Sequence, residues 1–123
     1  MEKQVNFREW FTSKGTRVLA GKSAANNEKL IEQAENKETL LHTANPGSPF
    51  VNIKSKRPTK ADIYDAALFC AKYSQDWRDN KQDVKIHIFK TEDVHKERTM
   101  KTGTFGVKKF KEVVAKKVDI LKI

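Results

Sequence analysis

The segment Leu40-Leu41-His42-Thr43-Ala44-Asn45-Pro46-Gly47-Ser48-Pro49-Phe50-Val51-Asn52-Ile53 places two apolar runs on either side of a Pro-Gly pair. Proline presets φ at about −65° and glycine allows a positive φ, so the pair favours a type II turn. We therefore predict two strands that meet at this turn, with His42, Asn45 and Ser48 gathered beside it. Both a plain structural hairpin and a binding loop held by a rigid sheet fit this pattern.

The length of 123 residues fits one domain with its own core. Cys70 is the only cysteine, which excludes an internal disulfide and a multi-cysteine metal site. Its apolar neighbours indicate a buried thiol, as expected in a reducing compartment. The sequence contains no apolar run of about 18 residues and begins without a signal-peptide core. We therefore expect a cytoplasmic protein with no membrane span.

Basic residues dominate the charge balance. Lysine and arginine number 25 against 16 acidic residues, which gives a net charge of +9 and an isoelectric point near 9.7. Such a field attracts polyanions, nucleic acid first and an anionic membrane surface second. Lysine-rich surfaces also arise from genome composition and from solubility.

The N-terminal part predicts a hairpin followed by a helix. Strands are expected over 5–12 and 17–21, joined by a glycine-containing turn. Asn26 or Asn27 is a suitable helix cap, and the residues that follow have the 3- and 4-residue spacing of a buried helix face.

The second half predicts a long helix and two strands. Thr59 and Asp62 have the spacing of an acidic capping box at the start of a helix over 59–77. Its core stripe consists of Ile63, Ala66, Ala67, Cys70, Tyr73 and Trp77. Alternation predicts a strand over 84–90. We also expect a strand within 108–123, with a helix over 110–117 as the alternative. The whole order indicates a single α+β domain with a mixed, mainly antiparallel sheet and two principal helices.

Several segments together resemble the NFACT-R domain, the RNA-binding module of NFACT proteins. They are Phe7–Gly15 with Val18–Gly21, Asn27–Ile31, His42 with Pro46-Gly47-Ser48, Ala66-Ala67 with Tyr73-Ser74, and Val94–Lys96 with Thr102–Phe105. The resemblance runs nearly from end to end. It implies an RNA-binding function at the ribosome, in a quality-control-like role.

The resemblance has one clear departure. Where the family usually has a second histidine after Pro-Gly-Ser, this chain has Pro49, so no histidine pair is expected within that loop. The chain also resembles a stand-alone form of the domain, so neither the tailing activity nor the tRNA recruitment of full-length NFACT proteins is carried over.

The motifs of catalysis are missing from the sequence. His42, His87 and His95 lack metal-ligand spacing, and neither glycine-rich nucleotide motif is present. We therefore expect no cofactor, no metal and no enzyme activity. An enzyme acting on RNA or a nucleotide would be favoured only by turnover of that substrate that is blocked when His42 is replaced.

The predicted binding site is a basic rim around the Pro-Gly turn that contacts the backbone of rRNA or tRNA. Lysine and arginine would contact phosphates, and the polar side chains would bind phosphate or 2′-hydroxyl oxygens. The predicted residues are His42, Asn45, Ser48, Lys54, Lys56, Arg57, His95, Lys96, Arg98, Lys101, Thr102 and Thr104. Two alternatives remain open: a merely solvated surface, and a module that docks on a ribosomal or quality-control protein without RNA contact. The oligomeric state is also open.

Overall fold

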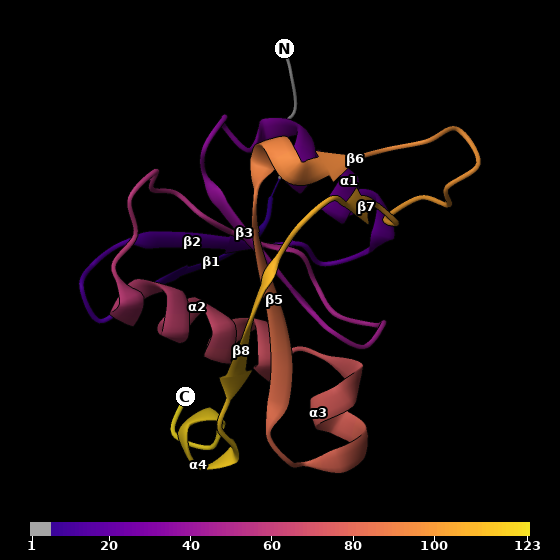
Figure 1. Ribbon diagram of the computed structural model, residues 1–123. Coiled ribbons are helices and arrows are strands. Elements are labelled where there is room, and N and C mark those ends of the chain that lie inside the picture. Colours follow the sequence, from indigo (N-terminus) through magenta and orange to yellow (C-terminus); the bar gives the residue numbers. More distant parts are fainter. Residues whose placement is uncertain (1–5) are drawn as a thin grey trace.

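Six strands form one sheet in the order β1-β2-β4-β3-β5-β8 (Figure 1). The computed structural model describes residues 6–123. The strands are β1 Arg8–Phe11, β2 Arg17–Ala20, β3 Thr39–Thr43, β4 Val51–Ile53, β5 Val84–Lys90 and β8 Lys111–Ala115. Every neighbouring pair is antiparallel. The predicted α+β class with a mainly antiparallel sheet is confirmed.

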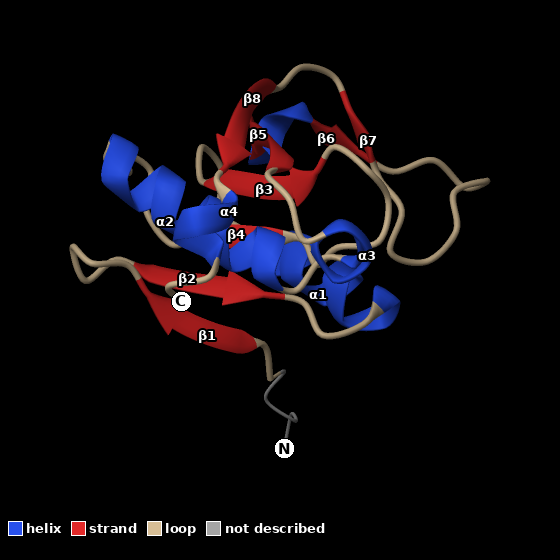
Figure 2. Ribbon diagram, turned by 90° about the horizontal axis from the view of Figure 1, so that it is seen from below, coloured by secondary structure: helices blue, strands red, loops and turns tan. Residues whose placement is uncertain are grey.

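The sheet curves around the longest helix. The helices are α1 Ala24–Gln33, α2 Lys60–Lys72, α3 Gln75–Asn80 and α4 Lys117–Ile120. Figure 2 shows α2 between β1 and β2 on one side and β3, β5 and β8 on the other. The outer face of the sheet carries α1 and a small hairpin of β6 Val94–His95 and β7 Gly106–Val107, which follows the 3₁₀ turn η1 Thr91–Asp93. We call residues 94–107 the arm.

Alternation along the strands supplies two cores, one on each face of the sheet. In β3, Leu41 packs with the α2 core, whereas Leu40 packs with the α1 core. In β5, Ile86 faces α2 and Phe89 faces α1. His42 and His87 follow the same alternation and therefore share the outer face with Leu40 and Phe89.

The predicted capping box of α2 is present. The Thr59 side chain accepts a hydrogen bond from the Asp62 N–H, and the Asp62 carboxylate accepts one from the Thr59 N–H. Asp62 also accepts a hydrogen bond of 2.7 Å from the Thr12 hydroxyl, which ties the β1–β2 turn to the start of the helix. Burial raises the pKa of the Cys70 thiol to about 12, in keeping with its predicted place in the core.

Two predicted helix boundaries are wrong. The first helix begins at Ala24 with Ser23 as its cap, because Asn27 instead lies buried and accepts a hydrogen bond from the Phe50 N–H. The predicted helix over 59–77 divides into α2 and α3, because the buried Ser74 hydroxyl caps a new helix at the Trp77 N–H. Tyr73 therefore leaves the core stripe and is 36% exposed.

The C-terminal segment also differs from its prediction. The strand of this segment is β8, and residues 117–120 form the short helix α4. The alternative helix over 110–117 is wrong, since β8 pairs along its length with β5. The predicted strand over 5–12 is confirmed at Arg8–Phe11, whereas Val5 lies outside the described residues.

Candidate nucleic-acid interface

The bend between β3 and β4 is held by its own polar groups. The Thr43 N–H donates to the Ser48 hydroxyl at 3.1 Å, and the Thr43 hydroxyl donates to the Asn45 carbonyl. Gly47 has φ +92°, as the Pro-Gly pair predicts. Its carbonyl accepts a hydrogen bond of 2.7 Å from the Gln75 N–H, so the bend packs directly on α3. The bend is therefore tied both to itself and to α3 by hydrogen bonds.

His42 lies in a row of polar residues that crosses the outer face of the sheet. It is the cross-strand partner of His87, which is in turn the partner of Glu112. His87 Nε2 lies 3.4 Å from the Glu112 carboxylate. The sequence has no second histidine at position 49, but the pairing of β3 with β5 supplies one from a distant segment.

The environment of His42 favours its neutral form. Burial lowers the pKa of His42, and the nearby His87 acts in the same direction, while the Thr43 carbonyl 2.8 Å from Nδ1 opposes them. The ring centroid of His42 lies 4.4 Å from that of Phe50. In the neutral tautomer that donates from Nδ1 to Thr43, Nε2 is a hydrogen-bond acceptor.

Glu28 of α1 fixes the arm. Its carboxylate lies 2.8 Å from Lys96 Nζ and accepts a hydrogen bond of 3.0 Å from the Gly103 N–H. The hydrogen bond from Lys96 lowers the pKa of Glu28, which is therefore ionised at neutral pH. Lys96 Nζ also lies 4.7 Å from the ring centroid of Phe105. Lys96 thus has a structural role in addition to its predicted role in RNA binding.

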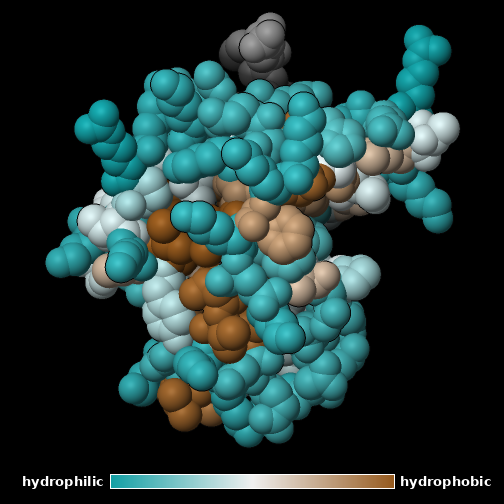
Figure 3. Space-filling view, in the orientation of Figure 1, coloured by the Kyte–Doolittle hydropathy of each residue, from teal (hydrophilic) through white to brown (hydrophobic). Residues whose placement is uncertain are grey.

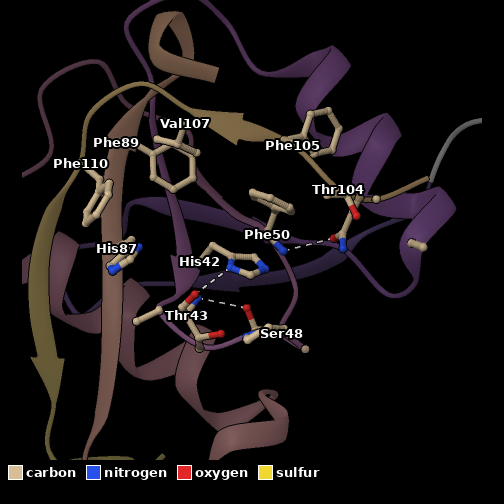
Figure 4. A pocket seen from close by; sticks show the side chains of 16 residues that line it. His42, Thr43, Ser48, Phe50, His87, Phe89, Thr104, Phe105, Val107 and Phe110 are labelled. Carbon is tan, nitrogen blue, oxygen red and sulfur yellow. Dashed lines mark hydrogen bonds between the residues drawn. The ribbon is translucent and has the colours of Figure 1, made fainter. Parts of the chain in front are cut away.

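Part of the predicted site lines one cavity of about 510 Å³ between the sheet, the bend and the arm. We call it the aromatic cavity, because its walls include Phe50, Phe89, Phe105 and Phe110 (Figure 4). Of the predicted residues, His42, Ser48 and Thr104 line it. Asn45 is exposed on the bend and donates a hydrogen bond to Asp76.

The predicted basic rim is divided between two ends of the molecule. Register pairs Thr39 with Ile53, so Lys54 leaves the hairpin at the end away from the bend. Its ammonium lies 2.8 Å from the buried Glu38 carboxylate and 3.0 Å from the Gln33 amide oxygen. Figure 1 shows the loop that leads into α2 on the side opposite the arm. The expectation that exposed Lys56 and Arg57 join the rim at the bend is therefore wrong.

The remaining predicted residues belong to the arm. Arg98, Lys101 and Thr102 are exposed on it. The His95 ring lies over Gly106, and a Cβ at that position would come within 2.1 Å of it. His95 Nδ1 is buried without a hydrogen-bond partner in the described part of the chain. The arm thus carries the exposed cations Arg98 and Lys101 in addition to Lys96, which is paired with Glu28.

A second hollow beside the bend contains cations that the sequence did not single out. We call it the basic hollow, with a volume of about 270 Å³, lined by Arg8, Lys22 and Arg78 together with Ser48, Gly47 and the start of α1. No carboxylate is among its lining residues in the part of the chain that the structure describes. The Arg8 guanidinium lies 4.4 Å from the ring centroid of Tyr73. These cations come from three distant segments, and only tertiary structure brings them together.

The hydropathy of the surface varies between regions. Figure 3 shows hydrophilic residues over most of one face, with hydrophobic atoms beside β8 and over α4. Among residues 6–123, Val118 and Leu121 are the most exposed large aliphatic side chains, at 65% and 64%. Within residues 6–123, no helix has the length and apolar character needed to cross a membrane. No cluster of metal-ligating side chains occurs within the same range.

Two comparisons place this fold among known proteins. The family model described as the NFACT protein RNA binding domain matches residues 5–109. A solved structure, "The structure of the C-terminal of the fibronectin/fibrinogen-binding protein from Streptococcus suis (FBPS)", is similar with a TM-score of 0.85 and 20% sequence identity. The match covers 99% of this chain and 50% of that one, so the chain spans about half the length of that structure. This likeness shows the fold alone.

No curated protein matched the sequence. The family match nevertheless extends from the first hairpin through the bend and the arm to the residue before Phe110. It therefore contains the bend, the arm and all three cations of the basic hollow. On this evidence the chain belongs to the NFACT protein RNA binding domain family.

Proposed function

We propose that this RNA-binding module contacts the backbone of rRNA or tRNA with the end of the molecule that carries the bend, in a ribosome-associated, quality-control-like role in the cytoplasm. The observation that carries the proposal is the basic hollow, where Arg8, Lys22 and Arg78 converge without a lining carboxylate. Arg98 and Lys101 are further exposed cations on the arm, whose Gly103 N–H is bonded to Glu28 of α1. The proposed role is binding without catalysis.

The charge distribution supports contact with phosphates. A lysine or arginine that neutralises a phosphate releases a condensed counterion, so each contact adds to affinity and to its salt dependence. Phosphate contacts position a protein without reading sequence, and structured RNA is recognised mainly by shape and backbone. We therefore expect little base specificity from the cations themselves.

Charge reversal at the two ends of the molecule tests the proposal. The bend-end variant is Lys22→Glu, Arg78→Glu and Arg98→Glu, and all three side chains are exposed. The matched control is Lys56→Glu, Arg57→Glu and Lys60→Glu, which are exposed beside the start of α2 and change the net charge equally. Binding of a structured RNA hairpin is measured by fluorescence anisotropy at fixed salt.

We expect the bend-end variant to lose at least tenfold in affinity, and the control to lose only the smaller, nonspecific effect of reduced net charge. Equal losses in the two variants would reject the bend end as the binding surface. Unchanged binding in both would reject backbone contact by either cluster.

Docking on a ribosomal or quality-control protein is the second candidate. The exposed Val118 of α4 and Leu121 directly after it favour this function, because apolar side chains on a surface are available for a protein partner. Binding to ribosomal subunits that resists high salt, and that is lost in Val118→Ser with Leu121→Ser, would select this function over RNA contact.

A further inference from the structure

The aromatic cavity has the dimensions and lining of a small-molecule site, although the proposed backbone contacts do not require it. Its volume of about 510 Å³ lies within the range of roughly 300–1,000 Å³ typical of such sites. Phe50 forms edge-to-face contacts with Phe89 and Phe105, with centroid distances of 6.3 and 5.4 Å. These mutual contacts hold the inner wall in place and leave the space in front of it open to a ligand.

Phe110 forms the outer wall of this cavity. Its ring stacks on His87 with a centroid distance of 3.9 Å and an interplanar angle of 19°. The side chain is nevertheless 51% exposed, so the packing with His87 leaves much of the ring in contact with solvent. Exposed aromatic rings at the mouth of a cavity are the platforms on which proteins stack unpaired bases.

Polar side chains interrupt the aromatic wall. His42, His87 and Thr104 line the cavity and offer nitrogen and oxygen atoms to the edge of a flat ligand (Figure 4). A nucleobase needs both stacking surfaces and hydrogen-bonding groups along its edge. A purely aliphatic ligand would leave these polar groups unpaired, which disfavours it.

The aromatic cavity also adjoins the basic hollow. Ala24, Asn27, Gly47 and Ser48 line both. An RNA strand that leaves the cavity past these shared residues therefore enters the basic hollow, which Arg8, Lys22 and Arg78 line. An aromatic site next to a cationic site suits a nucleotide, which combines a flat base with a negatively charged phosphate.

We propose that the aromatic cavity receives one unstacked nucleobase of a single-stranded RNA segment, stacked against Phe110, while a phosphate of the same segment occupies the basic hollow. This inference rests on the proposed function and adds the substrate class, a single-stranded segment with one extruded base. Duplex RNA would be held by the cations alone.

Phe110→Ala tests the inference, and Phe11→Ala is its matched control. Phe11 is exposed to a similar extent, at 54%, but it lies on β1 and does not line the cavity. Each variant is titrated with a single-stranded RNA oligonucleotide, with the same ribose-phosphate chain lacking its bases, and with a blunt RNA duplex. Circular dichroism and thermal unfolding establish that both variants remain folded.

We expect Phe110→Ala to weaken binding of the intact single strand about 5- to 150-fold, as for the loss of one stacked base. Its binding of the baseless chain and of the duplex should match that of the unmodified protein. Phe11→Ala should bind all three as the unmodified protein does. Equal binding of the intact strand by both variants would overturn the inference, while salt-dependent binding of the duplex would still support the proposed function.

A second measurement identifies the occupant of the cavity directly. Adenosine and uridine monophosphates are added while the imidazole signals of His42 and His87 are followed by NMR. Shifts at both histidines that disappear in Phe110→Ala are expected. Shifts with N-acetylphenylalaninamide but not with nucleotides would overturn the inference in favour of a protein ligand. If the unmodified protein binds no RNA at all, the proposed function fails together with the inference.

Discussion

Gly47 illustrates how one residue sets the geometry of the candidate site. Its φ of +92° is strained for any other residue, and an added Cβ would lie 2.9 Å from Gln75 Cβ. Gly15 has a similar φ of +85° but open space around the position of a Cβ. Comparing the same substitution at the two glycines therefore distinguishes the cost of backbone strain from the cost of steric contact.

We predict that Gly15→Ala lowers the free energy of unfolding by about 1–2 kcal/mol through backbone strain alone. Gly47→Ala should lower it by a further amount on the order of 1 kcal/mol, because α3 must shift away from the bend. Urea denaturation of both variants measures the difference. Equal losses would contradict the packing of the bend on α3.

The buried environment of His42 predicts that the stability of the fold depends on pH. Its folded-state pKa is lowered by burial from the ordinary value of 6.5, so the unfolded chain binds the proton more readily. The stability associated with neutral His42 is present above pH 6.5 and is lost as the pH falls below that value. NMR titration should place the midpoint of the His42 imidazole below 6.5. A midpoint at or above 6.5 would contradict the buried environment.

At the scale of elements, the arm is predicted to depend on Glu28. Glu28→Ala removes the partner of Lys96 and the acceptor of the Gly103 N–H. Hydrogen exchange of amides over 96–105 should therefore accelerate, while that of β3 and β5 stays unchanged. The matched control is Glu32→Ala, on the same helix, whose carboxylate forms an exposed ion pair with Lys29 and not with Lys96. Equal exchange in the two variants would contradict the attachment.

The same contact predicts a pH dependence of the arm. The pKa of Glu28 is lowered from 4.5 by the hydrogen bond from Lys96, so the unfolded chain binds this proton more tightly than the folded one. The attachment is fully present above pH 4.5 and weakens as the pH falls through the lowered value. Exchange of the arm amides, corrected for intrinsic rates, should rise in that range in the unmodified protein but not in Glu28→Ala.

Local patterns explain which elements the sequence could predict. Strand β5 follows its alternation from Val84 to Lys90, and α2 begins at its capping box. The break between α2 and α3 was not predictable from periodicity. Trp77 lies four residues after Tyr73, so the helical spacing of apolar residues continues across the cap at Ser74. Four residues are likewise too few for a pattern to separate α4 from a strand.

The parts of the site that depend on contacts between distant segments could not be predicted from the sequence. The bend and its glycine conformation follow from adjacent residues, so they were predictable. The pairing of His42 with His87, and the meeting of Arg8, Lys22 and Arg78, depend on strand order and helix placement. Charge alone assigned Lys54 to the binding site, because the sequence does not reveal its buried partner Glu38.

At the scale of the whole molecule, positive charge is divided between the bend end and the start of α2. We predict that the logarithm of RNA affinity falls linearly with the logarithm of salt concentration. The bend-end variant should reduce the magnitude of this slope by roughly 2 to 3, since each of its three lost phosphate contacts removes roughly 0.7–0.9. An unchanged slope, measured from 50 to 300 mM salt, would show that these three cations contact no phosphate.

Backbone-amide NMR mapping with an RNA hairpin measures directly where RNA lies on this surface. The largest shifts are expected at residues 21–24 and 47–48 and along the arm over 98–104. Shifts concentrated at 54–60, or confined to α4, would contradict RNA contact at the bend end.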